Sequence, residues 1–354
     1  MEQVASASNC VIYGKYPCVD GDEEEAIKHP VGMESFIIHL PYAVSPVVIP
    51  AQVAVKWHND VIQSLEDQTM AKGDFLLVSA PKAGTHLAWE IMSMLANGKA
   101  TYSTEPKHLT WCEFLSFPEI LRQGERGPRI INTHRSLSQL PPNFRLNSTK
   151  TVACMRNPKD VLVSFYYHMR NGVPKVNGEF IKFDDMFDFL LRSKYVPFGR
   201  TLDHYADIWD NYRDDPNTLI IFFEDIKENP TQTIRLIAEH MEISASEDLI
   251  ARIAMAIDIS VMREGKYCTE RQFRHRYGEN ATLYRKGEIG DWKNHFSCQQ
   301  NIEFDNIFNL WNSDRRIPFR FEPSLPSPHS YVHKLLEHSL GWRERITSHD
   351  SKIH

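Results

Sequence analysis

Four short apolar runs constrain the fold of this chain more than any other feature. They comprise residues 75–78, 129–131, 151–155 and 219–223. Short continuous runs of this kind are typical of strands that are covered on both faces, as in a parallel sheet. The four runs therefore predict the strands of a buried central sheet.

Helical patterns follow three of these runs. Residues 87–95 carry apolar side chains at helical spacing, and Pro158 suits the first turn of a helix that reaches about residue 169. A further helix is expected over residues 231–241. Strands that alternate with helices form right-handed β-α-β units around a parallel sheet. The sequence therefore predicts an α/β protein, a single three-layer α/β/α domain with a central parallel sheet.

The two ends of the chain differ from this regular part. Residues 1–45 mix a charged run with Pro and Gly, and the chain is Pro- and His-rich from residue 323 onward. We expect an N-terminal arm over 1–45, the main domain over 46–322, and a C-terminal tail over 323–354 with a short helix near 332–340.

Charge and cysteine usage exclude several classes of protein. The chain has 40 Lys and Arg against 46 Asp and Glu, so no global basic field attracts nucleic acid or an anionic membrane. Its six cysteines show no metal-ligand spacing, which argues against a zinc site or a disulfide scaffold. The N-terminus lacks a secretory pattern, and the most apolar window, 36–55, contains three prolines. We expect a cytoplasmic protein, without metal, whose anion sites are local.

The first candidate anion site is residues 79–85, between a predicted strand and a predicted helix. A tight loop at a helix N-terminus presents backbone N–H groups and the positive end of the helix dipole, and Lys82 adds a charge. The order differs from the nucleotide-hydrolase P-loop because the lysine precedes the glycine. The sequence thus predicts a strand–loop–helix phosphate-binding loop, and a plain turn with a solvated lysine is the alternative.

Two further segments could hold an anion. Residues 156–160 place Arg156 at the carboxyl end of a strand, where open parallel sheets bind ligands, with Ser164 on the following helix. Residues 285–293 combine Arg285 and Lys286 with two glycines, which suits a loop that wraps an anion. Taken alone, residues 156–160 are equally well explained as a helix-capping segment with exposed charges, whereas a plain solvated charge run rarely carries glycines like those of residues 285–293.

Together and in this order, the three segments resemble the cytosolic sulfotransferase family. Residues 81–85 are similar to the family's P-K-S-G-T loop, residues 156–164 to its R-N-x-K-D-V-x-V-S segment, and residues 285–293 to its R-K-G-x-x-G-D-W-K signature. Residues 223–230 are similar to its Y-E-D-M-K-E-N-P stretch, which we interpret as structural. The resemblance covers about residues 57–321 and identifies the chain as a divergent member of the type 1 sulfotransferase domain family.

The resemblance implies transfer of a sulfuryl group from 3′-phosphoadenosine 5′-phosphosulfate (PAPS) to a hydroxyl or amine. The product would be adenosine 3′,5′-bisphosphate (PAP), and no metal would take part. His134, which matches the family's K-T-H motif, would be the general base, and Lys82 would stabilise the leaving group. The remaining implied nucleotide contacts are Ala83, Gly84, Thr85, His86, Leu87, Arg156, Ser164, Phe198, Ser260, Arg285, Lys286 and Gly287.

Several of these positions depart from the family pattern. Asn132 stands where the family has Lys, which removes one cation near the transferring group. His86 replaces a Thr, Leu87 replaces an adenine-stacking Trp, and Phe198 replaces a Tyr near the 3′-phosphate. Near Ser260 a second adenine-flanking aromatic residue is also missing. We expect PAPS to bind with a poorer affinity than is usual, since each lost stacking face is worth about 1–3 kcal/mol.

Two alternatives to an ordinary sulfotransferase follow from these departures and from the fold. One is a member that binds PAP or PAPS with little or no turnover; the other is a retinol-dehydratase-like enzyme that sulfonates and then eliminates. Retention of His134 favours turnover over the first. The resemblance implies a small-molecule acceptor. Residues 266–272 do not match the family's dimer segment, so a monomer and a homodimer formed through another surface are equally expected. Aromatic residues that could line an acceptor pocket, or simply pack in the core, are Trp111, Phe114, Phe117, Tyr166, Tyr167 and Phe187.

Overall fold

The computed structural model describes residues 70, 73–103, 107–112, 128–144, 149–172, 180–193, 196–265, 274 and 283–324, together with the backbone of four short strands nearer the N-terminus. Residues 1–321 form one compact unit and residues 322–354 a second. The expected helix near 332–340 and the segment 266–272 lie outside the described residues. The predicted domain boundaries stay a prediction.

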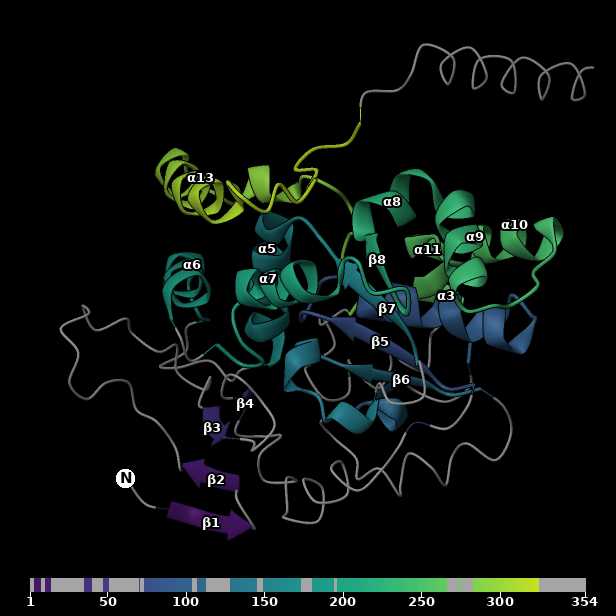
Figure 1. The fold of residues 1–354 in the computed structure, drawn as a ribbon. Coiled ribbons are helices and arrows are strands. Elements are labelled where there is room, and N and C mark those ends of the chain that lie inside the picture. Colours follow the sequence, from purple (N-terminus) through teal and green to yellow (C-terminus); the bar gives the residue numbers. More distant parts are fainter. Residues whose placement is uncertain are drawn as a thin grey trace, which may run out of the picture. The chain divides into compact units, whose positions relative to one another are not determined.

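A four-stranded parallel sheet forms the centre of the first unit (Figure 1). Its strands are β5 (Phe75–Ser79), β6 (Ile130–Thr133), β7 (Lys150–Met155) and β8 (Thr218–Phe222), in the order β6-β5-β7-β8. Phe75 is paired with Ile130 on one side and with Lys150 on the other. The four predicted strands are thereby confirmed, and β5 and β7 occupy the two central positions.

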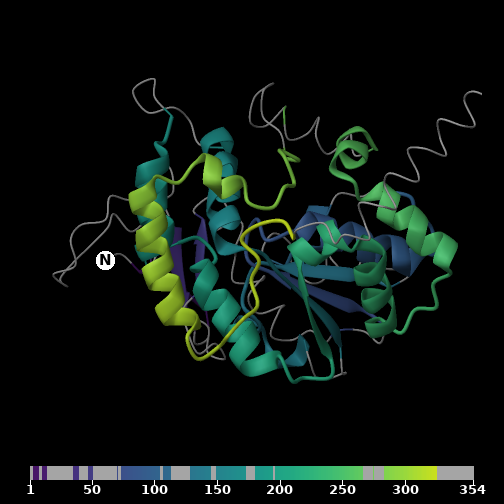
Figure 2. The same cartoon turned by 90° about the horizontal axis from the view of Figure 1, so that it is seen from above.

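Successive side chains of the central strands enter two different hydrophobic clusters. Leu77 of β5 and Val152 of β7 lie in one cluster, whereas Leu76 and Ala153 lie in the other. Neighbouring residues of a strand point to opposite faces, so both faces of the sheet are buried. Helices cover these faces on either side (Figures 1 and 2). The predicted three-layer α/β/α arrangement is confirmed.

The helices that surround the sheet include the three that the sequence predicts and several that it does not. α3 (Thr85–Asn97), α5 (Pro158–Gly172) and α9 (Pro230–His240) were expected, and α5 and α9 both begin at a proline. The others are α6 (Phe183–Arg192), α7 (Thr201–Tyr212), α8 (Phe223–Glu228), α10 (Glu247–Ala256), α11 (Ile259–Gly265) and α13 (Cys298–Asn312). Short 3₁₀ turns are η1 (Lys107–Thr110), η2 (Leu137–Gln139), η3 (Pro142–Phe144) and η4 (Asp291–Asn294).

A second, antiparallel sheet is formed by short strands near the N-terminus. Its strands are β1 (Gln3–Ala7), β2 (Cys10–Tyr13), β3 (Ser35–His39) and β4 (Val47–Pro50), paired in chain order. The sequence analysis predicts no strands here, because the charged and Pro-containing stretches between the strands mask these short apolar runs. No helix within the described part of the chain is long and apolar enough to cross a membrane.

Candidate functional site

The loop between β5 and α3 adopts a backbone conformation that only certain residues tolerate. Gly84 has φ 116°, and Lys82 has φ 68°, so both lie in the left-handed region. A Cβ at Gly84 would also lie 3.1 Å from Phe223 Cδ2 and 3.2 Å from Cys154 Sγ. Glycine is therefore required at position 84 by backbone conformation and by packing. The result is a tight turn that delivers the N-terminus of α3 directly to the carboxyl edge of the sheet.

Arg156 joins the three segments that the sequence analysis singles out. It follows β7, and its guanidinium donates to the Lys82 carbonyl at 3.4 Å and to the Glu288 carbonyl at 3.0 Å. The guanidinium also lies 4.1 Å from the centroid of the Phe223 ring. Residues that are 74 and 132 positions away in the sequence thus meet at one side chain. The structure places the loop of Lys82, the Arg156 segment and the loop after Arg285 at one edge of the sheet.

Asp160 fixes the third segment against α5. Its buried carboxylate accepts the backbone N–H of Gly290 at 2.8 Å and that of Trp292 at 2.9 Å, and it lies 4.0 Å from the Arg156 guanidinium. Burial raises the pKa of Asp160, and Arg156 and the two amides oppose that rise. Asp160 therefore positions the loop that carries the predicted phosphate-binding cations.

Replacing Asp160 with Ala should lower the free energy of unfolding by about 3 kcal/mol or more, because two partly buried amides lose their acceptor and a buried guanidinium loses its counter-charge. Chemical denaturation measures this loss. Asp210→Ala is the matched control, since Asp210 forms an ion pair with Arg315 at 2.9 Å on the surface, where such pairs are worth about 0–1 kcal/mol. Equal losses in the two variants would refute the positioning role of Asp160.

Arg285 and Lys286 converge on one carboxylate. Arg285 donates to Asp291 at 2.6 Å and Lys286 at 2.5 Å, and these contacts hold the pKa of Asp291 well below its usual range, against the effect of burial. Gly287 follows with φ 66°, and a Cβ there would lie 3.2 Å from Ile259 Cδ1 on α11. Both cations are therefore gathered at one point of the loop before any ligand binds.

His134 follows β6 and lies against the same loop. Its Nδ1 is 2.8 Å from the Ser79 carbonyl. A carbonyl oxygen only accepts, so Nδ1 carries the proton and Nε2 carries the lone pair. Burial, then the nearby charge of Lys107, lowers the pKa of His134 well below its ordinary value. The imidazole is thus neutral at pH 7, in the tautomer that takes up a proton at Nε2.

Aromatic rings surround this imidazole. The rings of Trp111 and Phe198 lie 5.0 Å and 5.4 Å from it, centroid to centroid, and 5.9 Å from each other. Phe198 has φ 66° and precedes Gly199, also in the left-handed region. The ring of Phe198, the residue that the family resemblance places near the 3′-phosphate, lies beside that of His134, and the ring of Phe223 contacts Arg156.

The other predicted nucleotide contacts lie on the flanks of this edge. Thr85 shares a 2.6 Å hydrogen bond with Ser79, and the ring of His86 is 6.1 Å from that of Tyr284. Leu87 lies on α3 and is buried in the hydrophobic cluster that this helix forms with the sheet. The remaining ones are Ala83, which is buried in the loop, Ser164, which is half-buried on α5, and Ser260, which is on α11 and donates to Asp258.

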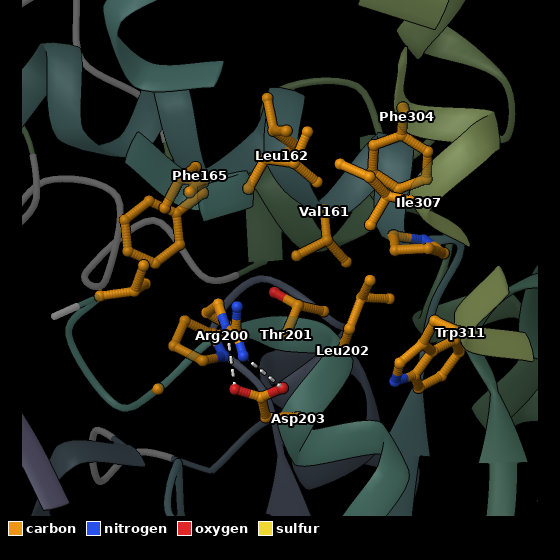
Figure 3. A pocket seen from close by; sticks show the side chains of 16 residues that line it. Val161, Leu162, Phe165, Arg200, Thr201, Leu202, Asp203, Phe304, Ile307 and Trp311 are labelled. Atoms are coloured by element: carbon orange, nitrogen blue, oxygen red, sulfur yellow. Dashed lines mark hydrogen bonds and ion pairs between the residues drawn. The ribbon is translucent and has the colours of Figure 1, made fainter. Parts of the chain in front are cut away.

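Two cavities border the turn at Phe198 and Gly199. One, of about 110 Å³, is apolar: Figure 3 shows Val161, Leu162 and Phe165 of α5 facing Thr201 and Leu202 of α7, with Phe304, Ile307 and Trp311 of α13 at its end. Pro81 of the loop lines this cavity as well. The other, of about 460 Å³, is polar and includes Ser136, Asp203 and Asp207. Space for a small molecule therefore adjoins the turn that contacts His134.

Two residues of the site were missed by the sequence analysis. Phe223 was interpreted as structural, yet its ring stacks on Arg156 and leaves little room for a side chain at position 84. Lys107 was not considered, because a single lysine outside any motif gives no signal in the sequence. Among the described residues no group of three His, Cys, Asp or Glu side chains is placed to hold a metal ion.

Comparisons with known proteins agree with this geometry. Residues 72–316 match the sulfotransferase domain family. The chain is 31% identical over 274 residues to human Sulfotransferase 1C2, which covers 74% of this chain and 89% of that protein. It is 29% identical over 254 residues to Sulfotransferase 6B1 of Danio rerio, covering 71% of this chain and 82% of the relative.

Solved structures with the same fold include two that contain PAP. A mouse sulfotransferase, SULT7A1, complexed with PAP superposes with a TM-score of 0.60 at 23% identity, over 75% of this chain and 92% of that one. Retinol dehydratase in complex with androsterone and the inactive cofactor PAP superposes with a TM-score of 0.61 at 19% identity, over 83% of this chain and 92% of that one. At these identities the likeness establishes the fold.

Proposed function

This chain belongs to the sulfotransferase family, and from that premise we propose that it transfers a sulfuryl group from PAPS to a hydroxyl or amine of a small molecule. The family match confirms the resemblance drawn from the sequence. The chain is a sulfotransferase enzyme; the donor, the acceptor class and the roles of individual residues form the proposal.

The observation that carries the proposal is the convergence at Arg156. Its guanidinium contacts the carbonyls of Lys82 and Glu288, which belong to the two other candidate anion segments. Arg156 thereby joins the segments that carry Lys82, Arg285 and Lys286 close to the N-terminus of α3, where a phosphate is favoured by backbone amides and by the helix dipole. A ligand with two phosphate groups, such as PAP, suits this arrangement better than a single anion does.

In the proposed binding mode, the loop amides and Lys82 hold the 5′-phosphosulfate, and Arg156, Arg285 and Lys286 hold the 3′-phosphate. Phe223 offers a ring at the base of the Arg156 guanidinium. Arg285 and Lys286 exchange their contacts with Asp291 for phosphate contacts or share them. The remaining predicted contacts of this binding mode are Ala83, Gly84, Thr85, His86, Leu87, Ser164, Phe198, Ser260 and Gly287.

His134 acts as the general base of the proposed reaction. PAPS supplies the activated sulfuryl group. As the acceptor oxygen or nitrogen forms its bond to sulfur, its proton moves to Nε2 of His134, and the bond from sulfur to the bridging oxygen breaks. The electron pair of that bond stays on the bridging oxygen of PAP, where Lys82 neutralises the charge. The Ser79 carbonyl holds the ring in the required tautomer.

The acceptor that fits is a small molecule with an apolar body. The rings of Trp111 and Phe198 beside His134 form an apolar wall where the acceptor nucleophile must approach the base. We place the enzyme in the cytoplasm, as a monomer or homodimer. Turnover is favoured over a PAP-binding relict because the base is retained in a reactive tautomer.

Calorimetric titration with PAP, followed by a screen of phenols, alcohols and amines with PAPS, tests the proposal. Binding of PAP together with appearance of a sulfated acceptor supports it. Binding without any product would favour the PAP-binding alternative, and release of a dehydrated product would favour sulfonation followed by elimination. Absence of binding at millimolar PAP would refute the proposed donor.

The rate should depend on pH in a way that follows from the pKa of His134. Because burial and Lys107 lower that pKa below 6.5, the base stays neutral, and kcat/KM should stay constant from pH 8 down to pH 6.5 and fall only below. A pH–rate profile measures this. A decline already centred near pH 7 would contradict a neutral, buried base.

The stability of the folded protein should also decrease as the pH falls. The folded pKa of His134 lies below the unfolded value, so the unfolded chain binds the proton first, and stability is lost as pH falls through 6.5. Circular dichroism at each pH separates this loss from titration of the base, because unfolding changes the spectrum and titration of His134 alone does not.

A further inference from the structure

Lys107 is a buried cation beside the candidate base that the mechanism above does not use. Its side chain is 7% exposed. It lies on η1, and the segment that follows is docked on the end of β6: the backbone N–H of Cys112 donates to the Asn132 carbonyl at 3.0 Å, and Trp111 forms a parallel bridge with Asn132. The lysine is thereby held against the strand that leads into His134.

Asn132 is oriented toward this lysine by its own hydrogen bonds. Its Nδ2 donates to the Lys107 carbonyl at 3.2 Å and to Thr110 Oγ1 at 3.0 Å. Those two bonds use both amide hydrogens, and Oδ1 accepts from Lys107 Nζ at 2.7 Å. The backbone carbonyl only accepts, so the orientation of the amide is fixed. A neutral amide positions the ammonium without cancelling its charge.

The charge of Lys107 acts where the base meets the acceptor. The centroid of the Trp111 ring is 5.0 Å from Lys107 Nζ and 5.0 Å from the centroid of the His134 ring. After burial, Lys107 is the largest cause of the lowered pKa of His134. A positive charge beside the imidazole disfavours its protonation. The same charge attracts an anionic group that is bound next to the base.

We propose that Lys107 is a further catalytic residue of the sulfuryl transfer, and that its ammonium contacts the sulfuryl oxygens at the place where Asn132 leaves a lysine missing. The inference rests on the proposed function. The non-bridging oxygens carry negative charge throughout the transfer, so Lys107 neither gives nor takes a proton. The cation has moved from strand β6 to η1, and Asn132, which cannot supply a charge, holds the replacement in position.

Binding measurements test this proposal independently of the acceptor. PAPS and PAP differ in the sulfuryl group, so Lys107→Met should weaken PAPS binding about tenfold while PAP binding stays within twofold, as expected for one charge-assisted contact. Lys99→Met, which removes an exposed lysine near the end of α3, should change neither. Equal effects on PAPS and PAP, or no effect on either, would overturn the role of Lys107 and leave the proposed function standing. Failure of the wild type to bind PAP would overturn both.

Turnover provides the second readout. With an accepted substrate, Lys107→Met should lower kcat about 10²-fold, as expected for loss of one preorganised charge contact, and should raise the pH of the acid limb because His134 loses a neighbouring cation. The exchange variant Lys107→Asn/Asn132→Lys should recover most of the lost kcat, because it returns a lysine to the strand and leaves an amide on η1. A folded exchange variant as inactive as Lys107→Met would argue that the single variant acts through packing and would refute the proposal.

Discussion

The variant His134→Ala should lower kcat by about 10²–10⁴-fold, the usual worth of a positioned general base. The expected cause is the loss of Nε2 as proton acceptor, since the Ser79 carbonyl fixes Nδ1 as the protonated nitrogen. Steady-state kinetics with an accepted phenol or amine, and calorimetry with PAP, measure the two consequences. PAP affinity should stay within about threefold, because no nucleotide contact is assigned to His134.

His240→Ala is the control for the removal of a histidine. Its Nε2 also donates to a backbone carbonyl, that of Thr151 at 3.0 Å, but the residue lies on α9 away from the loop. Its kcat should match that of the wild type. If His134→Ala retains more than a tenth of the wild-type kcat, another group must accept the proton and the assigned mechanism is wrong.

The second large effect is expected on nucleotide binding. The double variant Arg285→Ala/Lys286→Ala should weaken PAP binding about 10²–10⁴-fold, since each charge-assisted contact to a phosphate is worth about 1.5–3 kcal/mol. The effect should fall toward the lower end, because both side chains already contact Asp291 and the phosphate must compete with that carboxylate. Calorimetric titration with PAP at two salt concentrations measures it, and the salt dependence should shrink in the variant.

The matched control is Lys99→Ala/Arg235→Ala, which removes the same two charges from exposed positions. Arg235 pairs with Glu247 on the surface at 2.7 Å. PAP affinity should change by less than about twofold, as screening predicts for distant exposed charges. A control as weak in binding as the test variant would mean that net charge, and not the loop at Arg285, governs affinity.

The departures from the family pattern have different consequences in the structure. Asn132, at the position of the family's missing lysine, accepts a hydrogen bond from Lys107, which supplies the cation in our proposal. Leu87 is buried in a hydrophobic cluster, and a leucine side chain offers no aromatic face on which adenine could stack. We therefore expect these substitutions to weaken adenine binding more than they slow sulfuryl transfer.

The elements of the site were largely predictable from local sequence. Strand β5, the glycine of the loop and the first turn of α3 are encoded within about a dozen adjacent residues, and Pro158 marks the start of α5. The types of the binding groups were visible too, because arginine and lysine beside glycine are rare outside anion sites. The positions of Arg156, Arg285 and Lys286 in one site could be inferred from the family resemblance, but the contacts that gather them could not.

Local sequence alone encodes the strands of the central sheet, the phosphate loop and the identity of the chemical groups, since each depends on a few neighbouring residues. Only the tertiary structure decided that Lys107 meets Asn132, that Phe223 lies under Arg156, and that His134 is held at Nδ1 by Ser79. Those contacts join residues 25 to 67 positions apart. They depend on the order of strands in the sheet and on how the intervening segments cross its edge, which no local pattern encodes.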